Sequence, residues 1–429
     1  MSTALLTDRY ELTMLEAALQ AGIAERPSVF EVFARQLPAG RRYGVVAGLG
    51  RLVDALDRFR FDDAALGWLD DAHVVRPSTL TWLAGYRFQG DLTAYREGEL
   101  YVPGSPVLTV SAPFAQAVLL ETLVLSVLNH DSAMASAAAR IVTAAEGRGL
   151  LEFGSRRAHE EAAVAAARAA YLVGFDSTSN LAAGARHGIP TVGTTAHAFV
   201  LLHDDERAAF TAQVEAAGPD TVLLVDTFDL TQGIELALAV AGPRLGGIRI
   251  DSGDLAARAH AARLRLDAAG ATGARIVVSG DLDEHRIAAL ADAPIDTYGV
   301  GTRLVTGSGA PTAGFVYKLV ARAPSDGAPC VPVAKAGGRT ATVGGRKVAS
   351  RRLVDGTADA EVLRPWGQPV GPDERPLQVP VLVDGELRHD PDLATIRTFH
   401  RSVCDELSEQ ALALEPGEPA WQLHEEVHP

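Results

Sequence analysis

Hydrophobic and polar positions follow a regular rhythm through the middle of the chain. From about residue 149 to residue 302, short apolar, β-prone segments alternate with stretches of helical period. Each apolar segment ends in polar or glycine residues, as in IPTVGT, TVLLVDTF, GIRIDS and RIVVSGD. This alternation predicts parallel strands linked by helices, in a barrel-like α/β domain whose strands share one active face.

The pattern is different on both sides of this region. Residues 7–21 carry an apolar stripe of helical spacing, and residues 28–37 alternate like a strand. Strand-like pieces punctuated by Gly and Pro occupy 86–110, and similar pieces return after Phe315. We therefore expect a smaller mixed sheet domain that N-terminal and C-terminal segments build together.

The sequence predicts an organisation in four parts. The second part is expected to begin with two apolar helices. These helices are expected over 112–130 and from there to about Arg148. After residue 391 we expect a helix and then a loose, acidic tail. The four parts are an N-terminal sheet and helix domain (1–112), the barrel-like domain (113–314), a β-rich segment that returns to the N-terminal domain (315–390) and the C-terminal helix and tail (391–429).

The composition of the 429 residues argues against several classes of partner. The formal net charge is −15, and an acidic protein is a poor candidate for sequence-independent binding to nucleic acid or to an acidic membrane. No apolar run approaches the roughly 20 residues of a membrane span, and the N-terminus does not read as a signal peptide. Cys330 and Cys404 show no metal or disulfide spacing. We expect a cytoplasmic protein without nucleic-acid or membrane partners.

The most informative segment is GIRIDSGDL, residues 247–255. A strand runs into the turn Asp251-Ser252-Gly253-Asp254 and then into a helical stretch. Carboxylates and a hydroxyl suit the hydroxyls of a sugar, and a helix N-terminus suits a phosphate. Arg249 is unusual in a buried strand, so it must be paired or must face a ligand. The alternative interpretation is a helix cap with a structural salt bridge.

Two further segments carry candidate chemistry. GTTAHAF (193–199) places His197 just after a strand end, where it is a general base, a phosphate acceptor or a polar helix residue. EFGSRRAHE places Phe153 beside Arg156 and Arg157. An aromatic plane next to a guanidinium suits a flat, anionic aromatic ligand. The alternative is a core phenylalanine with two solvated arginines.

The remaining strand ends are acidic or rich in glycine. In TVLLVDTFDLTQG (221–233), Asp226 lies at a strand end and Asp229 lies just beyond it. SGDLDE (279–284) and GVGTRLVTG (299–307) are turns after apolar strands. Bare amides in such turns can hold a phosphate. Each turn alone is a weak signal, but together on one face they favour a phosphosugar site.

Taken together and in order, these strings resemble the nicotinate phosphoribosyltransferase family. The resemblance covers most of the chain and implies a barrel-like α/β domain plus a sheet domain, in a homodimer whose active sites are shared between subunits. It is carried by TDRYELTM, RQLPAGRRYGVVAGL, EFGSRR, FDSTSNLAAG, GTTAHAF, LLVDTFD, GIRIDSGDL, GVGTRLVTG and FVYKLV.

The resemblance also implies a reaction and a set of roles. Nicotinate and phosphoribosyl pyrophosphate give nicotinate mononucleotide and pyrophosphate, the first step of NAD salvage from nicotinate, and ATP hydrolysis drives the step through a phosphohistidine with Mg²⁺ as cofactor. The implied catalytic residues are His197, which is phosphorylated, Asp226 and Asp251. The implied nicotinate ligands are Tyr10, reaching in from the other subunit, and Phe153, Arg156, Ser179, Thr194 and Arg249. The implied phosphoribosyl pyrophosphate ligands are Asp251, Ser252, Gly253, Asp254, Gly280, Gly301 and Thr302, with Asp251 and Asp254 also as Mg²⁺ ligands.

Three alternatives remain. The nicotinamide-using relatives carry an Asp where this chain has Ser179, and a carboxylate there would repel nicotinate, so Ser179 favours the acid. A catalytically silent phosphosugar-binding relative is disfavoured by the intact His197 and by both carboxylates of DSGDL. A dehydrogenase is disfavoured because no G-x-G-x-x-G opens a helix. Departures from the family pattern are Arg9, in place of an apolar residue, and the segment 335–347, which lacks the usual Ser and Pro.

Overall fold

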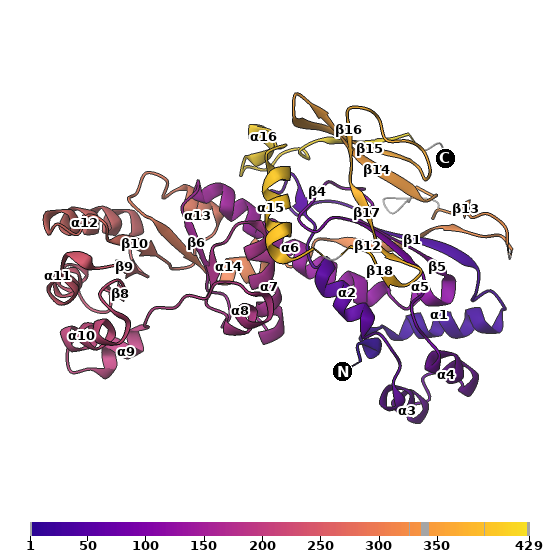
Figure 1. Cartoon of the computed structure of the whole chain (residues 1–429), viewed down its shortest axis with the longest axis horizontal. Helices are drawn as coiled ribbons and strands as arrows, with labels where there is room; N and C mark the ends of the chain where they lie inside the picture. Colours follow the sequence, from indigo (N-terminus) through magenta and orange to yellow (C-terminus); the bar gives the residue numbers. More distant parts are fainter. Residues whose placement is uncertain (1, 326, 336–342, 390, 427–429) are drawn as a thin grey trace. The chain divides into compact units, whose positions relative to one another are not determined.

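The computed structural model describes residues 2–325, 327–335, 343–389 and 391–426, so most of the atypical segment 335–347 lies outside the described residues. The chain forms two compact units (Figure 1). The sheet unit comprises Met1–Ser136 and Ala310–Pro429, and the parallel unit comprises Ala137–Gly309. The division after Ser136 falls inside helix α6 (Glu121–Ala145), whereas we expected the barrel-like part to begin at residue 113.

The parallel unit is built on a six-stranded sheet that curls as a half barrel, in the order β7-β6-β11-β10-β9-β8. All neighbouring strands are parallel, as the alternating pattern predicted. The strands are β6 (Gly149–Glu152), β7 (Ser177–Thr178), β8 (Val222–Leu224), β9 (Gly247–Ile250), β10 (Arg275–Val278) and β11 (Thr297–Val300).

One expected strand of this unit does not form. The segment IPTVGT makes only an isolated bridge between Thr178 and Thr191. Pro190 accepts a hydrogen bond from the Thr178 amide (3.0 Å), and Val192 donates to the Thr178 carbonyl (2.9 Å). Because Pro190 has no N–H to donate, the ladder is not extended on its other side, and the chain leaves the sheet.

Helices follow the strand ends, and polar side chains begin most of them. Asn180, Asp205, Asp229, Asp254 and Asp283 each accept a hydrogen bond from a backbone N–H in the first turn of a helix. Such caps satisfy amides that have no partner within the helix. The helices are α7 (Glu160–Val173), α8 (Leu181–His187), α9 (His197–Leu202), α10 (Glu206–Ala217), α11 (Leu230–Ala241), α12 (Leu255–Ala268), α13 (Glu284–Ala288) and α14 (Thr302–Val305).

The sheet unit has a seven-stranded antiparallel sheet in the order β13-β12-β1-β5-β3-β17-β18. C-terminal strands pair with N-terminal ones: β12 with β1, and β17 with β3. The prediction that the segment after Phe315 returns to the N-terminal sheet is therefore confirmed. The strands are β1 (Pro27–Ala34), β3 (Asp91–Tyr95), β5 (Leu108–Pro113), β12 (Phe315–Arg322), β13 (Val331–Pro332), β17 (Gln378–Val383) and β18 (Glu386–Leu387).

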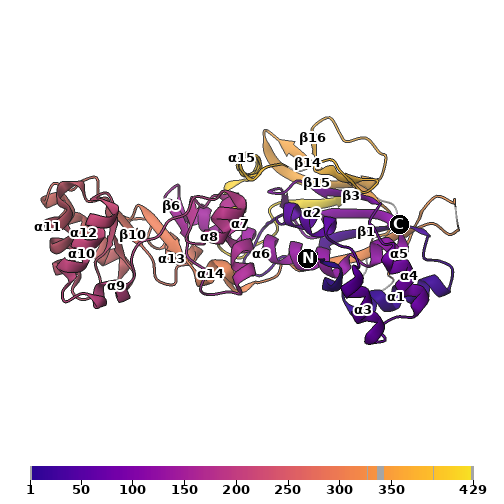
Figure 2. The ribbon, with the colours of Figure 1, turned by 60° about the horizontal axis from the view of Figure 1, so that its bottom comes forward.

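A second sheet of this unit has the order β16-β14-β15-β19 (Figure 2). Its strands are β14 (Lys347–Val354), β15 (Thr357–Pro365), β16 (Glu374–Pro376) and β19 (Gln422–Glu425), and a short pair joins β2 (Gly44–Val45) to β4 (Leu100–Tyr101). Our expectation of a loose tail was wrong for β19, which pairs parallel with β15. Trp421 is buried beside Arg351, whose Cζ lies 3.7 Å from the centre of the indole ring. This apolar anchor fixes the tail despite its acidic composition.

The helices of the sheet unit differ from expectation at one point. A single long helix, α6, runs through residue 130, and the break falls earlier, between α5 and α6, at 119–120. The apolar pattern is continuous across 112–148, so it does not mark the break. The other helices are α1 (Arg9–Gln20), α2 (Leu49–Asp57), α3 (Asp63–Asp71), α4 (Pro77–Ala84), α5 (Phe114–Val118), α15 (Leu393–Cys404) and α16 (Glu409–Leu412).

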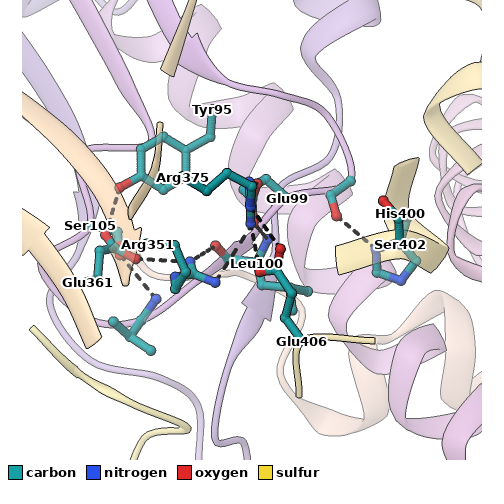
Figure 3. Close-up of polar contacts among 12 residues, drawn as sticks. Tyr95, Glu99, Leu100, Ser105, Arg351, Glu361, Arg375, His400, Ser402 and Glu406 are labelled. Carbon is teal, nitrogen blue, oxygen red and sulfur yellow. Dashed lines mark hydrogen bonds and ion pairs between the residues drawn. The ribbon is translucent and has the colours of Figure 1, made fainter. Parts of the chain in front are cut away.

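A buried ionic network joins distant segments of the sheet unit (Figure 3). Arg375 donates to Glu99 (2.6 Å) and to Glu406 (2.8 Å). Arg351 donates to Glu361 (3.1 Å), which also accepts from the Tyr95 hydroxyl (2.6 Å). These contacts connect the N-terminal strands, the second sheet and the segment after α15.

Among the described residues, every helix is too short or too polar to span a lipid bilayer.

Candidate functional site

Most of the predicted site residues of the parallel unit lie where its strands end. Parallel strands bring their carboxyl ends to one edge of a sheet, so residues far apart in sequence become neighbours there. Phe153 follows β6, Ser179 follows β7, Asp226 follows β8, Asp251 follows β9, and Gly280 and Gly301 follow β10 and β11.

Arg249 is paired and also lies against an aromatic ring. Its side chain is 13% exposed. Nε donates to Ser279 Oγ (2.9 Å), Nη1 to Thr194 Oγ1 (3.2 Å) and Nη2 to Asp251 Oδ1 (3.0 Å). Its Cζ lies 5.3 Å from the centre of the Phe153 ring. Two neutral hydroxyls and one carboxylate hold the guanidinium in place, so it can still attract an anion.

A cavity of about 220 Å³ lies beside this arginine. Arg156, Arg157 and Arg249 line it, together with Phe153 and the turns after β10 and β11. Gly299 makes room for the ring, because a Cβ there would lie 2.6 Å from Phe153. An aromatic face with three guanidinium groups suits a flat anion, and the carboxylates of Asp251 and Asp281 also line the cavity.

A second cavity, of about 410 Å³, continues along the same edge. The DSGD turn lines one side, and residues 279–282 line the other. Gly253 and Gly280 have φ values of +79° and +120°, which side chains rarely adopt. A Cβ on Gly280 would also lie 2.7 Å from the Asp251 carbonyl oxygen. The turns therefore need glycine, and close approach of backbone amides suits a phosphate.

The acidic residues of the site have separate tasks. Asp226, with 1% of its side chain exposed, accepts from the Asp251 amide (2.8 Å) and from Ser252 Oγ (2.9 Å) through Oδ2. It therefore fixes the DSGD turn. Asp254 accepts from the Ala257 amide (3.1 Å) and caps α12, which is the helix-cap alternative from the sequence. Asp251 contacts Arg249 and also accepts from the hydroxyl of Ser279.

His197 is the first residue of α9 and is partly buried. Its Nδ1 lies 3.0 Å from Thr227 Oγ1. Thr227 directly follows Asp226, so the histidine is tied to the end of β8. With Nδ1 engaged, Nε2 is the ring nitrogen for other chemistry.

Two predicted nicotinate ligands are placed differently. Ser179 donates its amide to the Glu152 carbonyl (2.9 Å), and it lines neither of the two cavities. Tyr10 belongs to α1 of the sheet unit and is 45% exposed. Partial burial, with Glu121 and Glu11 nearby, raises the pKa of the Tyr10 hydroxyl. Within the single chain, therefore, neither Ser179 nor Tyr10 lines the cavity formed by Arg156, Arg157 and Arg249.

Some contributors were missed from the sequence. Ser279 binds Arg249 and Asp251, and Thr227 binds His197, yet neither was singled out. The register of β10 against β9 pairs Val278 with Ile250, so Ser279 lies next to Asp251. That register is a tertiary fact, and the quoted strings do not contain it.

The residues present test the expected metal site. The described residues contain no group of three or more His, Cys, Asp or Glu side chains suited to a metal ion. Asp254 already uses one carboxylate oxygen as a helix cap. Mg²⁺ commonly takes one or two carboxylates and completes its shell with water and substrate phosphates. Asp251 Oδ1 likewise accepts from Arg249 and Ser279, so each of the two expected ligands has one carboxylate oxygen engaged within the protein.

Comparison with known proteins identifies relatives across the chain. Residues 5–129 match the family model of the nicotinate phosphoribosyltransferase (NAPRTase) N-terminal domain. The nicotinate phosphoribosyltransferase pncB1 of Mycobacterium tuberculosis is 57% identical over 427 residues, covering 97% of this chain and 94% of that protein. The nicotinate phosphoribosyltransferase of Bacillus subtilis is 42% identical over 329 residues, covering 75% and 67%. The crystal structure of human nicotinic acid phosphoribosyltransferase has a TM-score of 0.83 and 29% identity, and the match covers 97% of each chain.

Proposed function

The chain belongs to the nicotinate phosphoribosyltransferase family, and we propose that it joins nicotinate to phosphoribosyl pyrophosphate. The products are nicotinate mononucleotide and pyrophosphate, in the first step of NAD salvage from nicotinate. The observation that carries this proposal is the pair of adjoining cavities. One offers an arginine against an aromatic ring, and the other offers glycine turns and carboxylates.

Nicotinate is a flat ring with a carboxylate, and the smaller cavity matches both features. The ring stacks on Phe153, and Arg249 binds the carboxylate with help from Arg156 and the Thr194 hydroxyl. Ser179 has no negative charge, so nothing at that position repels the acid. These contacts favour nicotinate over nicotinamide.

Phosphoribosyl pyrophosphate occupies the larger cavity. The DSGD turn, which lines this cavity, binds the ribose hydroxyls. The 5′-phosphate lies where the two cavities meet, bound by the amides of Gly280, which lines both cavities, and of Gly301 and Thr302, which line the smaller one. The pyridine nitrogen forms a bond to the anomeric carbon, and the bond from that carbon to pyrophosphate breaks with its electron pair. No proton is transferred, so the residues serve to bind, orient and balance charge. Asp251 and Asp226 place negative charge near the carbon as it becomes positive.

His197 is the proposed phosphate acceptor from ATP. Thr227 holds Nδ1, which directs Nε2 toward the phosphate. A phosphorylated histidine adds a dianion near the end of β8 and thereby couples ATP hydrolysis to the order of neighbouring turns. Mg²⁺, when bound, balances the phosphate charge, with Asp251 and Asp254 as its proposed ligands.

The proposed homodimer supplies Tyr10 from one subunit to the nicotinate site of the other. An interface is supported by large apolar side chains that are exposed on the parallel unit, namely Leu181, Leu201, Leu202 and Phe228.

Mixing two inactive variants, Tyr10→Ala and His197→Ala, tests whether the active site is shared between subunits. Subunit exchange should restore up to half of the normal activity in each heterodimer. Verified exchange without any rescue would contradict a shared site.

A direct assay tests the reaction itself. The protein is incubated with phosphoribosyl pyrophosphate, Mg²⁺ and either nicotinate or nicotinamide, with and without ATP, and the mononucleotides are separated. We expect nicotinate mononucleotide, formed faster with ATP. Product with nicotinamide but not with nicotinate would identify the amide as the substrate. If neither base gives product, the result would favour a catalytically silent relative. We propose the cytoplasm as the place of reaction.

A further inference from the structure

The segment 193–197 carries two groups of the proposed site, although its residues belong to no strand. The helix α9 begins only at its last residue. Thr194 accepts a hydrogen bond from Arg249 Nη1 (3.2 Å), and His197 Nδ1 lies 3.0 Å from Thr227 Oγ1. A segment outside the sheet needs side-chain contacts to hold a fixed position.

A buried glutamine supplies such a contact. Gln213 lies on α10 and is 8% exposed. Its Oε1 accepts from the Thr195 hydroxyl (2.9 Å). Its Nε2 donates to the Thr221 hydroxyl and to the Val222 carbonyl oxygen, both at 3.0 Å. One side-chain amide therefore connects the segment 193–197 to the start of β8.

Hydrogen-bond chemistry fixes the orientation of this amide. A carbonyl oxygen can only accept, so the end of Gln213 that faces Val222 must be the NH₂ group. The other end is then an acceptor, and the Thr195 hydroxyl must donate to it. Because the amide is buried, loss of either partner leaves a polar group with its full desolvation penalty. The link therefore requires a glutamine and a hydroxyl at these two positions.

We propose that Gln213 is a positioning residue, which holds the segment 193–197 through the Thr195 hydroxyl and so keeps Thr194 and His197 at the strand ends. Thr195 directly follows Thr194 and lies two residues before His197, so a shift of its backbone moves both. Gln213 lines neither of the two cavities. It therefore acts through the segment and not by touching a substrate.

The consequence for catalysis rests on the proposed function. Gln213→Met keeps the length of the side chain and removes both hydrogen-bonding groups. The KM for nicotinate should rise roughly three- to tenfold, the scale of one neutral hydrogen bond, because Thr194 steadies the Arg249 that binds the carboxylate. Labelling of His197 by ATP should slow by a similar factor and not disappear. Without ATP, kcat and the KM for phosphoribosyl pyrophosphate should stay close to the wild type, since the turns that line its cavity follow β9 and β10.

Hydrogen–deuterium exchange tests the structural part of the proposal and needs no substrate. Exchange of the amides of 193–199 is followed by mass spectrometry in the wild type, in Gln213→Met and in Thr195→Val, which removes the same bond from the other side. Both variants should exchange this stretch roughly threefold faster or more, while α12 should exchange as in the wild type. Unchanged exchange of the stretch would overturn the proposal. If Gln213→Met does not fold, Thr195→Val decides alone, because Gln213 then keeps its bonds to the start of β8.

Matched variants separate positioning from general stability. Gln232→Met, at an exposed glutamine of α11, should leave the exchange and both Michaelis constants as in the wild type. The double variant Gln213→Met/Thr195→Val should raise the KM for nicotinate no further than Gln213→Met alone, because both changes remove one bond. Additive rises, or faster exchange with an unchanged KM for nicotinate, would reject the positioning role. A protein without transferase activity would refute the proposed function, and the exchange would still decide whether Gln213 holds the segment.

Discussion

The ionic network of the sheet unit and the strand-end site of the parallel unit differ in how far their buried carboxylates are paired with arginine. In the sheet unit, Glu99, Arg375 and Glu406 bind one another, and Glu361 receives both Arg351 and the Tyr95 hydroxyl (Figure 3). In the parallel unit, the charged groups near the strand ends are not fully paired with one another. Arg249 is held largely by hydroxyls, and buried oxygens of Asp226 and Glu206 have no partner among the described residues.

The difference shows what each kind of burial achieves. The sheet-unit network gives its carboxylates arginine partners and connects segments that are far apart in sequence, although Arg351 Nε and Nη1 have no hydrogen-bond partner among the described residues. Groups that are fixed but incompletely paired remain available to a ligand, and they cluster where strand ends meet. Changes in the two units should therefore separate: those in the sheet unit affect folding, and those in the parallel unit affect chemistry.

The largest expected effect is the loss of protein phosphorylation in His197→Ala. Without the imidazole, label from γ-³²P-ATP should fall to background, and ATP should no longer accelerate synthesis. Slow transfer without ATP should remain, because both substrate cavities are intact. The thermal midpoint should change little, since His197 is only partly buried. Undiminished labelling would move the acceptor to another residue, with His203 and His187 as the next candidates.

The next effect is a loss of stability when the sheet-unit network is broken. The Arg351 side chain is fully buried, and it contacts Glu361, the Leu100 carbonyl and Trp421. Arg351→Ala should lower the free energy of unfolding by about 3–5 kcal/mol, because Glu361 is left as a buried charge with one ion-pair partner fewer. Denaturant titration measures it.

Arg352→Ala is the matched control. Arg352 lies on the same strand as Arg351 and pairs with Asp359 of β15 at the surface, with 38% and 46% of the two side chains exposed. Its loss should cost about 0.2–1 kcal/mol. Equal losses for the two variants would contradict a special role for the buried network.

A smaller effect should appear at acid pH. Hydrogen bonds from Arg364 lower the pKa of Glu374 to about 2. A carboxyl with a depressed folded-state pKa stabilises the fold above its unfolded pKa, and this stability is lost as pH falls from about 4.3 toward the folded value. Glu374→Gln should remove about 1–2 kcal/mol at pH 7, after allowance for solvent screening. Below pH 2 the variant and the wild type should converge, and an unchanged gap there would show that packing and not charge is involved.

The sequence predicted much of this arrangement because strand ends carry their chemistry in short strings. The string around Asp251 contains a strand, a turn and a helix start, so its place at the sheet edge follows from local pattern. The role of Asp254 was harder to predict, because a helix cap and a ligand call for the same residue type. Gln213 gave no signal, since a glutamine within a helix is ordinary at the surface.

Other features depend on contacts across long stretches of chain. Ser279 reaches Arg249 only through the register of β10 against β9. The pairing of β19 with β15 depends on Trp421 finding Arg351, seventy positions earlier. The break between α5 and α6 leaves no mark in a continuous apolar pattern. Tertiary pairing decides all three, and local periodicity does not report it.

The most direct test is to measure both Michaelis constants in Arg249→Ala, together with its thermal midpoint. The KM for nicotinate should rise roughly ten- to a hundredfold, which corresponds to about 1.5–3 kcal/mol for a charge-assisted contact. The KM for phosphoribosyl pyrophosphate should change far less, and the thermal midpoint should stay close to that of the wild type. An equal rise in both constants, or a large loss of stability with unchanged nicotinate affinity, would contradict the account by making Arg249 a structural ion pair like those of the sheet unit.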